Sequence, residues 1–127
     1  MRNFFLSSND GFTLIEIMIV IGIIGILTAI SIPNFISYRR DSANGMAKSE
    51  AKNFYNAALA AAAKADTDTA WSTGSPPIGL SPNTTDITWT GDIQYKAADD
   101  SITSTLTATH VKGNITYSIA GDGVITP

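Results

Sequence analysis

The most prominent feature of the chain is a long apolar run near its N-terminus. Residues 17–38 contain no charged side chain, and residues 17–36 consist mostly of Ile, Val, Leu and Met. As a helix, residues 17–36 would be roughly 30 Å long, which is the thickness of the hydrocarbon core of a bilayer. Every face of this helix would be apolar, and a domain of 127 residues cannot surround it on all sides. The pattern therefore predicts a helix buried in a membrane or in the core of a filament.

A second helical pattern follows Pro33 and runs to about Lys64. It places a stripe of small residues on one face, at spacings of four or seven: Ala43, Ala47, Ala51, Ala58 and Ala62. Because small side chains let a sheet approach a helix closely, we expect the rest of the chain to pack on this stripe. The sequence Gly74-Ser75-Pro76-Pro77 then indicates a loop that extends to about Thr84.

Alternating apolar and polar positions in the last third of the chain predict antiparallel strands. Residues 101–110 show the alternation most clearly, with threonines on one face and Ile102, Leu106, Ala108 and His110 on the other. Shorter alternations occur around Ile87 and Trp89, around Ile93 and Tyr95, and from Ile115 to Ile119, and Asp99-Asp100 and Lys112-Gly113-Asn114 indicate turns. The predicted fold class is α+β, with a long N-terminal α-helix that packs in its outer half against a small antiparallel β-meander.

Charge is distributed unevenly along the chain. Residues 37–64 carry five basic and two acidic side chains, a net charge of +3, whereas residues 65–127 carry seven aspartates and two lysines, a net charge of −5. The whole chain has a net charge of −3, which argues against nucleic acid as its main partner.

Composition also limits the chemistry that the chain can perform. It contains no cysteine, which excludes a disulfide framework and a cysteine nucleophile. Its length excludes a multidomain enzyme. The sequence has no nucleophile–base pair, no glycine-rich phosphate loop and no metal-ligand motif. We therefore predict no enzymatic activity and no cofactor or metal.

Glu16 is an unfavourable residue for this position, because it follows Phe12-Thr13-Leu14-Ile15 at the start of the apolar run. A carboxylate well inside a membrane helix costs on the order of 3 kcal/mol, and such residues usually have a function. One interpretation is that Glu16 lies among the lipid headgroups and is hydrated. The other is that it pairs with a positive group from a neighbouring chain, such as a new amino terminus made by cleavage before Phe12.

The N-terminal quarter of the chain resembles the type IV prepilins. The resemblance covers the processing motif Gly11-Phe12-Thr13-Leu14-Ile15-Glu16 and the stem that continues through residues 17–38. It implies that a prepilin peptidase cuts the bond between Gly11 and Phe12 and methylates the new amino terminus of Phe12. It also implies that Glu16 of an incoming subunit neutralises the amine of Phe12 in a subunit already in the filament.

Together, the pattern and the resemblance divide the chain into four segments. Residues 1–11 are a leader peptide, residues 12–36 an apolar transmembrane or filament-core helix, residues 37–64 its amphipathic continuation, and residues 65–127 a loop and a small β head. The implied partners are further copies of the chain, the prepilin peptidase, the membrane, and an inner-membrane assembly platform with its ATPase. The implied location is the inner membrane with the head outside the cytoplasm, and then an extracellular pilus.

Gly22, Gly25 and Pro33 lie within the apolar stem and allow two interpretations. Glycine and proline are tolerated in membrane helices generally. Alternatively, they weaken the helix, because Pro33 cannot donate a hydrogen bond to the carbonyl of Ala29 and each glycine costs up to about 1 kcal/mol relative to alanine. The resemblance to pilins implies local melting here in the assembled fibre.

Three alternatives remain open at this level. The first is a pseudopilin of a type II secretion system, which the absence of cysteines near the carboxyl end leaves open. The second is a singly anchored or secreted binding module, because Ala29-Ile30-Ser31 is a tolerable signal-peptidase site. The third concerns orientation: Arg39 and Arg40 alone would favour a cytoplasmic location for that end of the stem. The motif implies the opposite orientation, which we expect.

The head offers two weak candidates for metal binding. His110 is the only histidine, and we predict a strand-end residue rather than a ligand. Five aspartates of the head could gather a calcium ion, but they lack EF-hand spacing, and hydrated turns are the preferred interpretation: Asp86, Asp92, Asp99, Asp100 and Asp122.

Overall fold

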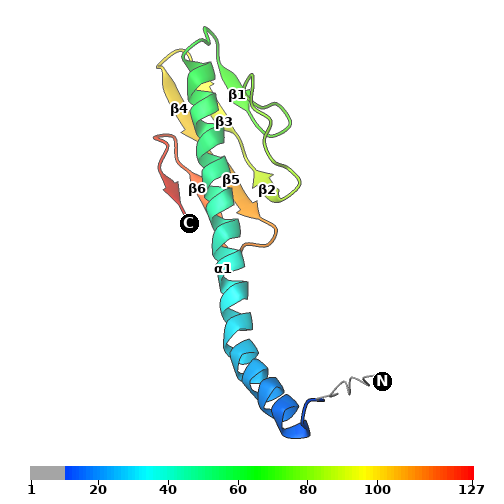
Figure 1. The fold of residues 1–127 in the computed structure, drawn as a ribbon. Coiled ribbons are helices and arrows are strands. Elements are labelled where there is room, and N and C mark those ends of the chain that lie inside the picture. The colour runs from blue at the N-terminus through cyan, green and yellow to red at the C-terminus, as the bar shows by residue number, and fades with distance from the viewer. Residues whose placement is uncertain (1–10) are drawn as a thin grey trace, which may run out of the picture. The chain divides into compact units, whose positions relative to one another are not determined.

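The computed structural model describes residues 11–127 and contains one long helix followed by seven short strands (Figure 1). The helix, α1, spans Leu14–Ala62. The chain divides into two compact units at Ile36, so that α1 begins in the first unit and ends in the second. We refer to residues 14–36 as the stem and to Ser37–Pro127 as the head.

The head packs on the small-residue face of α1, as predicted. Ala43, Ala47, Ala51, Ala58 and Ala62 are all buried. Phe54 and Tyr55 supply the bulk between them, and Phe54 packs against Trp89 with 5.5 Å between the ring centroids. Because the helix presents methyl groups over most of this face, the strands can lie close against it.

The strands form two antiparallel sheets that lie along α1 in the head (Figure 1). One sheet has the order β1-β3-β4 and the other the order β2-β5-β6-β7. Their bounds are Thr69–Trp71 (β1), Ile87–Thr90 (β2), Ile93–Lys96 (β3), Ser101–Ser104 (β4), Thr107–His110 (β5), Thr116–Ile119 (β6) and Ile125–Thr126 (β7). Both sheets contribute to one core with α1, through buried residues that include Ile87, Ile93, Leu106, Ala108 and Ile119. The predicted α+β class, with a long helix against antiparallel β structure, is confirmed.

The predicted strand over residues 101–110 is wrong in one respect, because it is divided into β4 and β5. The pairing register continues across the break, since Thr90 pairs with Thr107 in one sheet and Ile93 with Ser104 in the other. The break faces the segment between β2 and β3, where Gly91 has a φ of 85° and interrupts the extended backbone. The result is a long hairpin that bends from one sheet into the other.

Two strands were not predicted from the sequence, and the helix ends at Ala62 rather than at about Lys64. β1 lies in the segment interpreted as loop, and β7 has only two residues. Both are edge strands, whose pairing depends on distant segments rather than on a local pattern. The turns predicted at Asp99-Asp100 and at Lys112-Gly113-Asn114 are confirmed.

A buried polar residue, Asn44, ties α1 to the turn between β5 and β6. Its side-chain oxygen accepts hydrogen bonds from the backbone N–H groups of Asn114 (3.1 Å) and Ile115 (3.3 Å). Its amide nitrogen donates to the side-chain oxygen of Asn114 at 3.0 Å. The helix therefore provides an acceptor for two backbone N–H groups of the turn.

We expect Asn44→Ala to destabilise the head by about 2 kcal/mol, because it removes the acceptor of two backbone N–H groups in a buried place. The measurement is thermal unfolding of the full chain in detergent, followed by the fluorescence of Trp71 and Trp89, which both lie in the head. The matched control is Asn53→Ala, at an exposed position of the same helix. Equal midpoints for the two variants would show that the Asn44 contacts contribute nothing.

Candidate functional site

The predicted cleavage site lies in an open segment before the first turn of α1. Gly11, Phe12 and Thr13 are outside the helix and exposed, and the side chain of Phe12 is 83% exposed. Among the described residues, no atom beyond the adjoining residues lies within 4 Å of the position that a Cβ on Gly11 would occupy. The bond between Gly11 and Phe12 is therefore sterically accessible. The predicted leader, apart from Gly11, lies outside the described residues.

Thr13 and Glu16 cap the N-terminus of α1 reciprocally. The backbone N–H and the hydroxyl of Thr13 each donate to Oε2 of Glu16, both at 2.9 Å, and the backbone N–H of Glu16 donates to the Thr13 hydroxyl at 3.3 Å. This is a capping box, in which a threonine and a glutamate three residues later satisfy donors that the helix leaves unpaired. The arrangement fixes where the helix begins and holds the Glu16 carboxylate beside Thr13, the residue after Phe12.

This local role of Glu16 was missed at the level of the sequence, although its signal is present. Thr13-Leu14-Ile15-Glu16 has the threonine-x-x-glutamate spacing of a capping box directly before an apolar run. The capping box uses only one carboxylate oxygen. Among residues 11–127, Oε1 of Glu16 has no hydrogen-bond partner, and it is available to a group from outside the chain.

The stem exposes its apolar side chains on all sides. Every residue from 11 to 42 is exposed, including those of its isoleucine-rich stretch. By length and composition, α1 is the one helix among the described residues that could cross a membrane, with a mean hydropathy of 2.6 in its most apolar window. An exposed apolar helix of this size is unstable in water, so it requires lipid or other protein chains around it.

Gly22, Gly25 and Pro33 do not interrupt α1, which is helical throughout Leu14–Ala62. No atom lies within 4 Å of a Cβ placed on either glycine. Pro33 lacks the N–H that would bond to the carbonyl of Ala29. Local melting of this region concerns the assembled fibre and stays a prediction.

The metal-binding candidates of the head have ordinary structural partners. His110 is buried at the end of β5, and its Nδ1 accepts a hydrogen bond from the backbone N–H of Lys112 at 3.0 Å. Asp92 accepts hydrogen bonds from Gln94 and from Thr105. Within residues 11–127, no group of three or more His, Asp or Glu side chains is arranged to hold a metal ion.

A family model matches the same N-terminal region, and two curated proteins match part of the chain. Residues 6–32 match a family model described as the prokaryotic N-terminal methylation motif. Over 49 residues the chain is 57% identical to the type IV major pilin protein PilA of Myxococcus xanthus (strain DK1622). Over 33 residues it is 64% identical to the prepilin peptidase-dependent protein D of Escherichia coli (strain K12). No solved structure matches the chain.

These matches confirm the predicted resemblance to the type IV pilin and prepilin family, and they are limited to part of each protein. The first covers 39% of this chain and 22% of the relative, and the second 26% and 23%. The chain therefore spans less than a quarter of the length of either curated relative that it matches. Residues 6–32, which match the family model, contain the processing motif, the capping box and most of the apolar stem.

Proposed function

We propose that the chain is a structural subunit of a type IV pilus, which polymerises through its N-terminal helix into an extracellular filament. The observation that carries the proposal is the methylation motif at the exposed beginning of an apolar helix. A helix of this kind can be covered by lipid before assembly and by the stems of other subunits afterwards. The head then remains on the outside, available for adhesion, motility or surface contact.

In this proposal, Glu16 sets the register in which subunits add. An ammonium group and a carboxylate are each expensive in an apolar core, and pairing removes much of both costs. A stem added in another register would leave the amine of Phe12 in one subunit and Glu16 in the next unpaired. The pair therefore selects one register, while packing of the apolar stems supplies most of the cohesion outside the bilayer, at roughly 25 cal/mol per Å² of surface buried.

The proposal requires partners that act before and during assembly. The prepilin peptidase would cut the bond between Gly11 and Phe12 and methylate Phe12. Apolar stems gain little from association inside a bilayer, because lipid tails are equally apolar. Extraction of each subunit from the inner membrane would therefore be driven by an assembly platform and its ATPase.

We expect the protein taken from its own cells to begin at Phe12 and to be heavier than that sequence by one methyl group, as measured by intact mass. This result would support prepilin processing. A chain that retains residues 1–11 would contradict the proposal and favour a plain membrane anchor. A chain that begins after Ser31 would contradict it in favour of an ordinary secreted protein.

Electron microscopy of the same cells separates the pilus from a type II secretion pseudopilus. Long filaments on the cell surface that contain the processed chain would support a pilus subunit. A processed chain without surface filaments would instead favour a short periplasmic pseudopilus, for which the N-terminal motif would be equally suitable.

A further inference from the structure

Four of the head's aspartates lie near the end of α1, together with Lys64 and Lys96. Lys48 and Lys52 lie earlier on the same helix, away from that end. Asp66 and Asp68 follow directly after α1, and Asp99 and Asp100 lie in the turn between β3 and β4 (Figure 1). The two acidic segments are in contact, because Oδ1 of Asp68 accepts a hydrogen bond from the backbone N–H of Ala97 at 2.8 Å.

The carboxylates at this end act on one another's surroundings. Burial, then a hydrogen bond with the side chain of Asp100, and then the charges of Asp100, Asp66 and Asp68 raise the pKa of Tyr95. The hydrogen bond from Ser101, and more weakly the charge of Lys96, lower the pKa of Asp99. Ala98, Asp99 and Asp100 are all exposed. The tip of the β3–β4 turn is thus a narrow, exposed and negatively charged projection.

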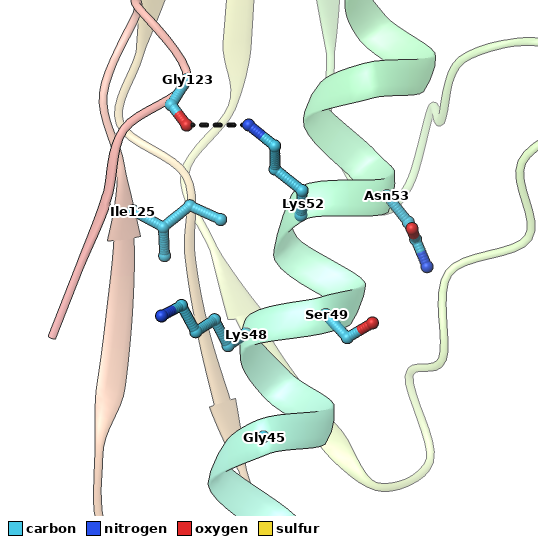
Figure 2. A pocket seen from close by; sticks show the side chains of 7 residues that line it. All are labelled: Gly45, Lys48, Ser49, Lys52, Asn53, Gly123 and Ile125. Atoms are coloured by element: carbon cyan, nitrogen blue, oxygen red, sulfur yellow. Dashed lines mark hydrogen bonds between the residues drawn. The ribbon is translucent and has the colours of Figure 1, made fainter.

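A basic groove lies between α1 and the C-terminal segment of the head. It has a volume of about 500 Å³ and contains no acidic side chain; its lining residues are Gly45, Lys48, Ser49, Lys52, Asn53, Gly123 and Ile125 (Figure 2). Lys52 is held in place, because its Nζ donates to the carbonyl of Gly123 at 3.2 Å. It also lies 5.6 Å from the centroid of the Tyr55 ring.

Lys48 is the unpartnered cation of this groove. Its side chain extends past Ile125 (Figure 2), and its ammonium has no hydrogen-bond or ion-pair partner among the described residues. The glycine at position 45, one turn before Ser49, has no side chain to fill the floor of the groove. The groove therefore presents a positive charge beside small residues, which leave room for a ligand.

We infer that this groove receives the acidic β3–β4 turn, residues 97–100, of a second copy of the chain. The inference rests on the proposed function, because it describes a contact between neighbouring heads of a filament. Charge complementarity identifies the occupant: Asp99 and Asp100 would face Lys48 and Lys52. Ala97 and Ala98 keep the rest of the turn small.

The contact has the form that a filament needs. The groove and the turn are different surfaces of one chain, so each copy can use its groove for one neighbour and its turn for another, and the contact can repeat along a filament. Complementary charges at such an interface fix orientation and register more than they add affinity. The head would in this way support the register that Glu16 sets among the stems.

The test is cross-linking in intact filaments of the full chain that carries Ser49→Cys and Ala98→Cys. Both substitutions are at exposed positions, keep every charge, and introduce the only cysteines of the chain. Treatment with a short bis-maleimide should give a ladder of covalent multimers on a denaturing gel. Either single variant should give at most dimers, and Thr88→Cys with Ala98→Cys, an exposed pair outside the groove, should give no ladder. Intact filaments of the Ser49/Ala98 pair without a ladder would overturn the inference.

Charge variants provide a second measurement. Lys48→Glu should lower the yield of filaments, or the cross-linked fraction, by about fivefold, whereas Lys48→Arg should preserve both. Equal values for the two variants would overturn the inference even if the cysteine pair failed to assemble. The unmodified chain distinguishes failure of this contact from failure of the proposed function. If the proposed function were wrong, the unmodified chain itself would form no filaments.

Discussion

Replacement of Glu16 by alanine is expected to abolish filament assembly while cleavage before Phe12 continues. When one partner of an ion pair in apolar surroundings is removed, the other charge remains buried and unpaired, which costs about 3–5 kcal/mol. The yield of filaments should therefore fall on the order of 100-fold or more. The measurement is the quantity of filaments sheared from cells, with the intact mass of the membrane-bound chain as evidence of processing. Normal filaments from this variant would contradict the pairing.

The capping box makes a second variant necessary, because alanine removes two properties of Glu16 at once. Glu16→Gln keeps a side chain that can accept the N–H of Thr13 and cap α1, but it has no charge to pair with the amine of Phe12. If the charge pair sets the register, both variants should fail to assemble. If only the alanine variant fails, the role of Glu16 is to begin the helix, and the register must come from elsewhere.

The fold could be predicted largely where the evidence is local in the sequence. The stripe from Ala43 to Ala62 has a helical period, and it predicts both the helix and the face on which the head packs. The alternation in residues 101–110 predicts which side chains are buried, because Leu106, Ala108 and His110 all face inward. The division of this segment into β4 and β5 could not be predicted in the same way, since it depends on Gly91, which lies between β2 and β3 and faces the break.

The candidate site shows the same limit. The motif from Gly11 to Glu16 is contiguous, so the sequence alone indicates the cleaved bond and the residues beside it. The basic groove is different, because Lys48 and Lys52 come from α1 whereas Gly123 and Ile125 come from the C-terminus. Only the folded head brings these segments together. The spacing of the two lysines resembles that of any solvated helical face, and it gave no signal of a groove.

Replacement of Gly91 by alanine is expected to destabilise the head strongly, although it adds a single methyl group. Gly91 has a φ of 85°, and a Cβ at this position would lie 2.2 Å from the carbonyl oxygen of Thr105 and 2.7 Å from its carbonyl carbon. The obstacle is backbone rather than a flexible side chain, so β4 and β5 would have to shift. The cost combines a left-handed backbone conformation with overpacking and should be roughly 3 kcal/mol, which lowers the unfolding midpoint by more than about 10 °C.

Gly79→Ala is the matched control, because it separates conformational strain from the steric contact. Gly79 also has a φ of 85°, but no atom of residues 11–127 other than those of its two chain neighbours lies within 4 Å of a Cβ placed there. Gly79→Ala should therefore lower the free energy of unfolding only by the cost of the left-handed backbone conformation, about 1 kcal/mol. Thermal unfolding of the full chain in detergent, followed by the fluorescence of the two tryptophans, gives both midpoints. Equal losses would mean that the bend between the two sheets is loose enough to admit a methyl group. A larger loss at Gly91 would establish close packing of the hairpin at its bend, which also orients the acidic β3–β4 turn.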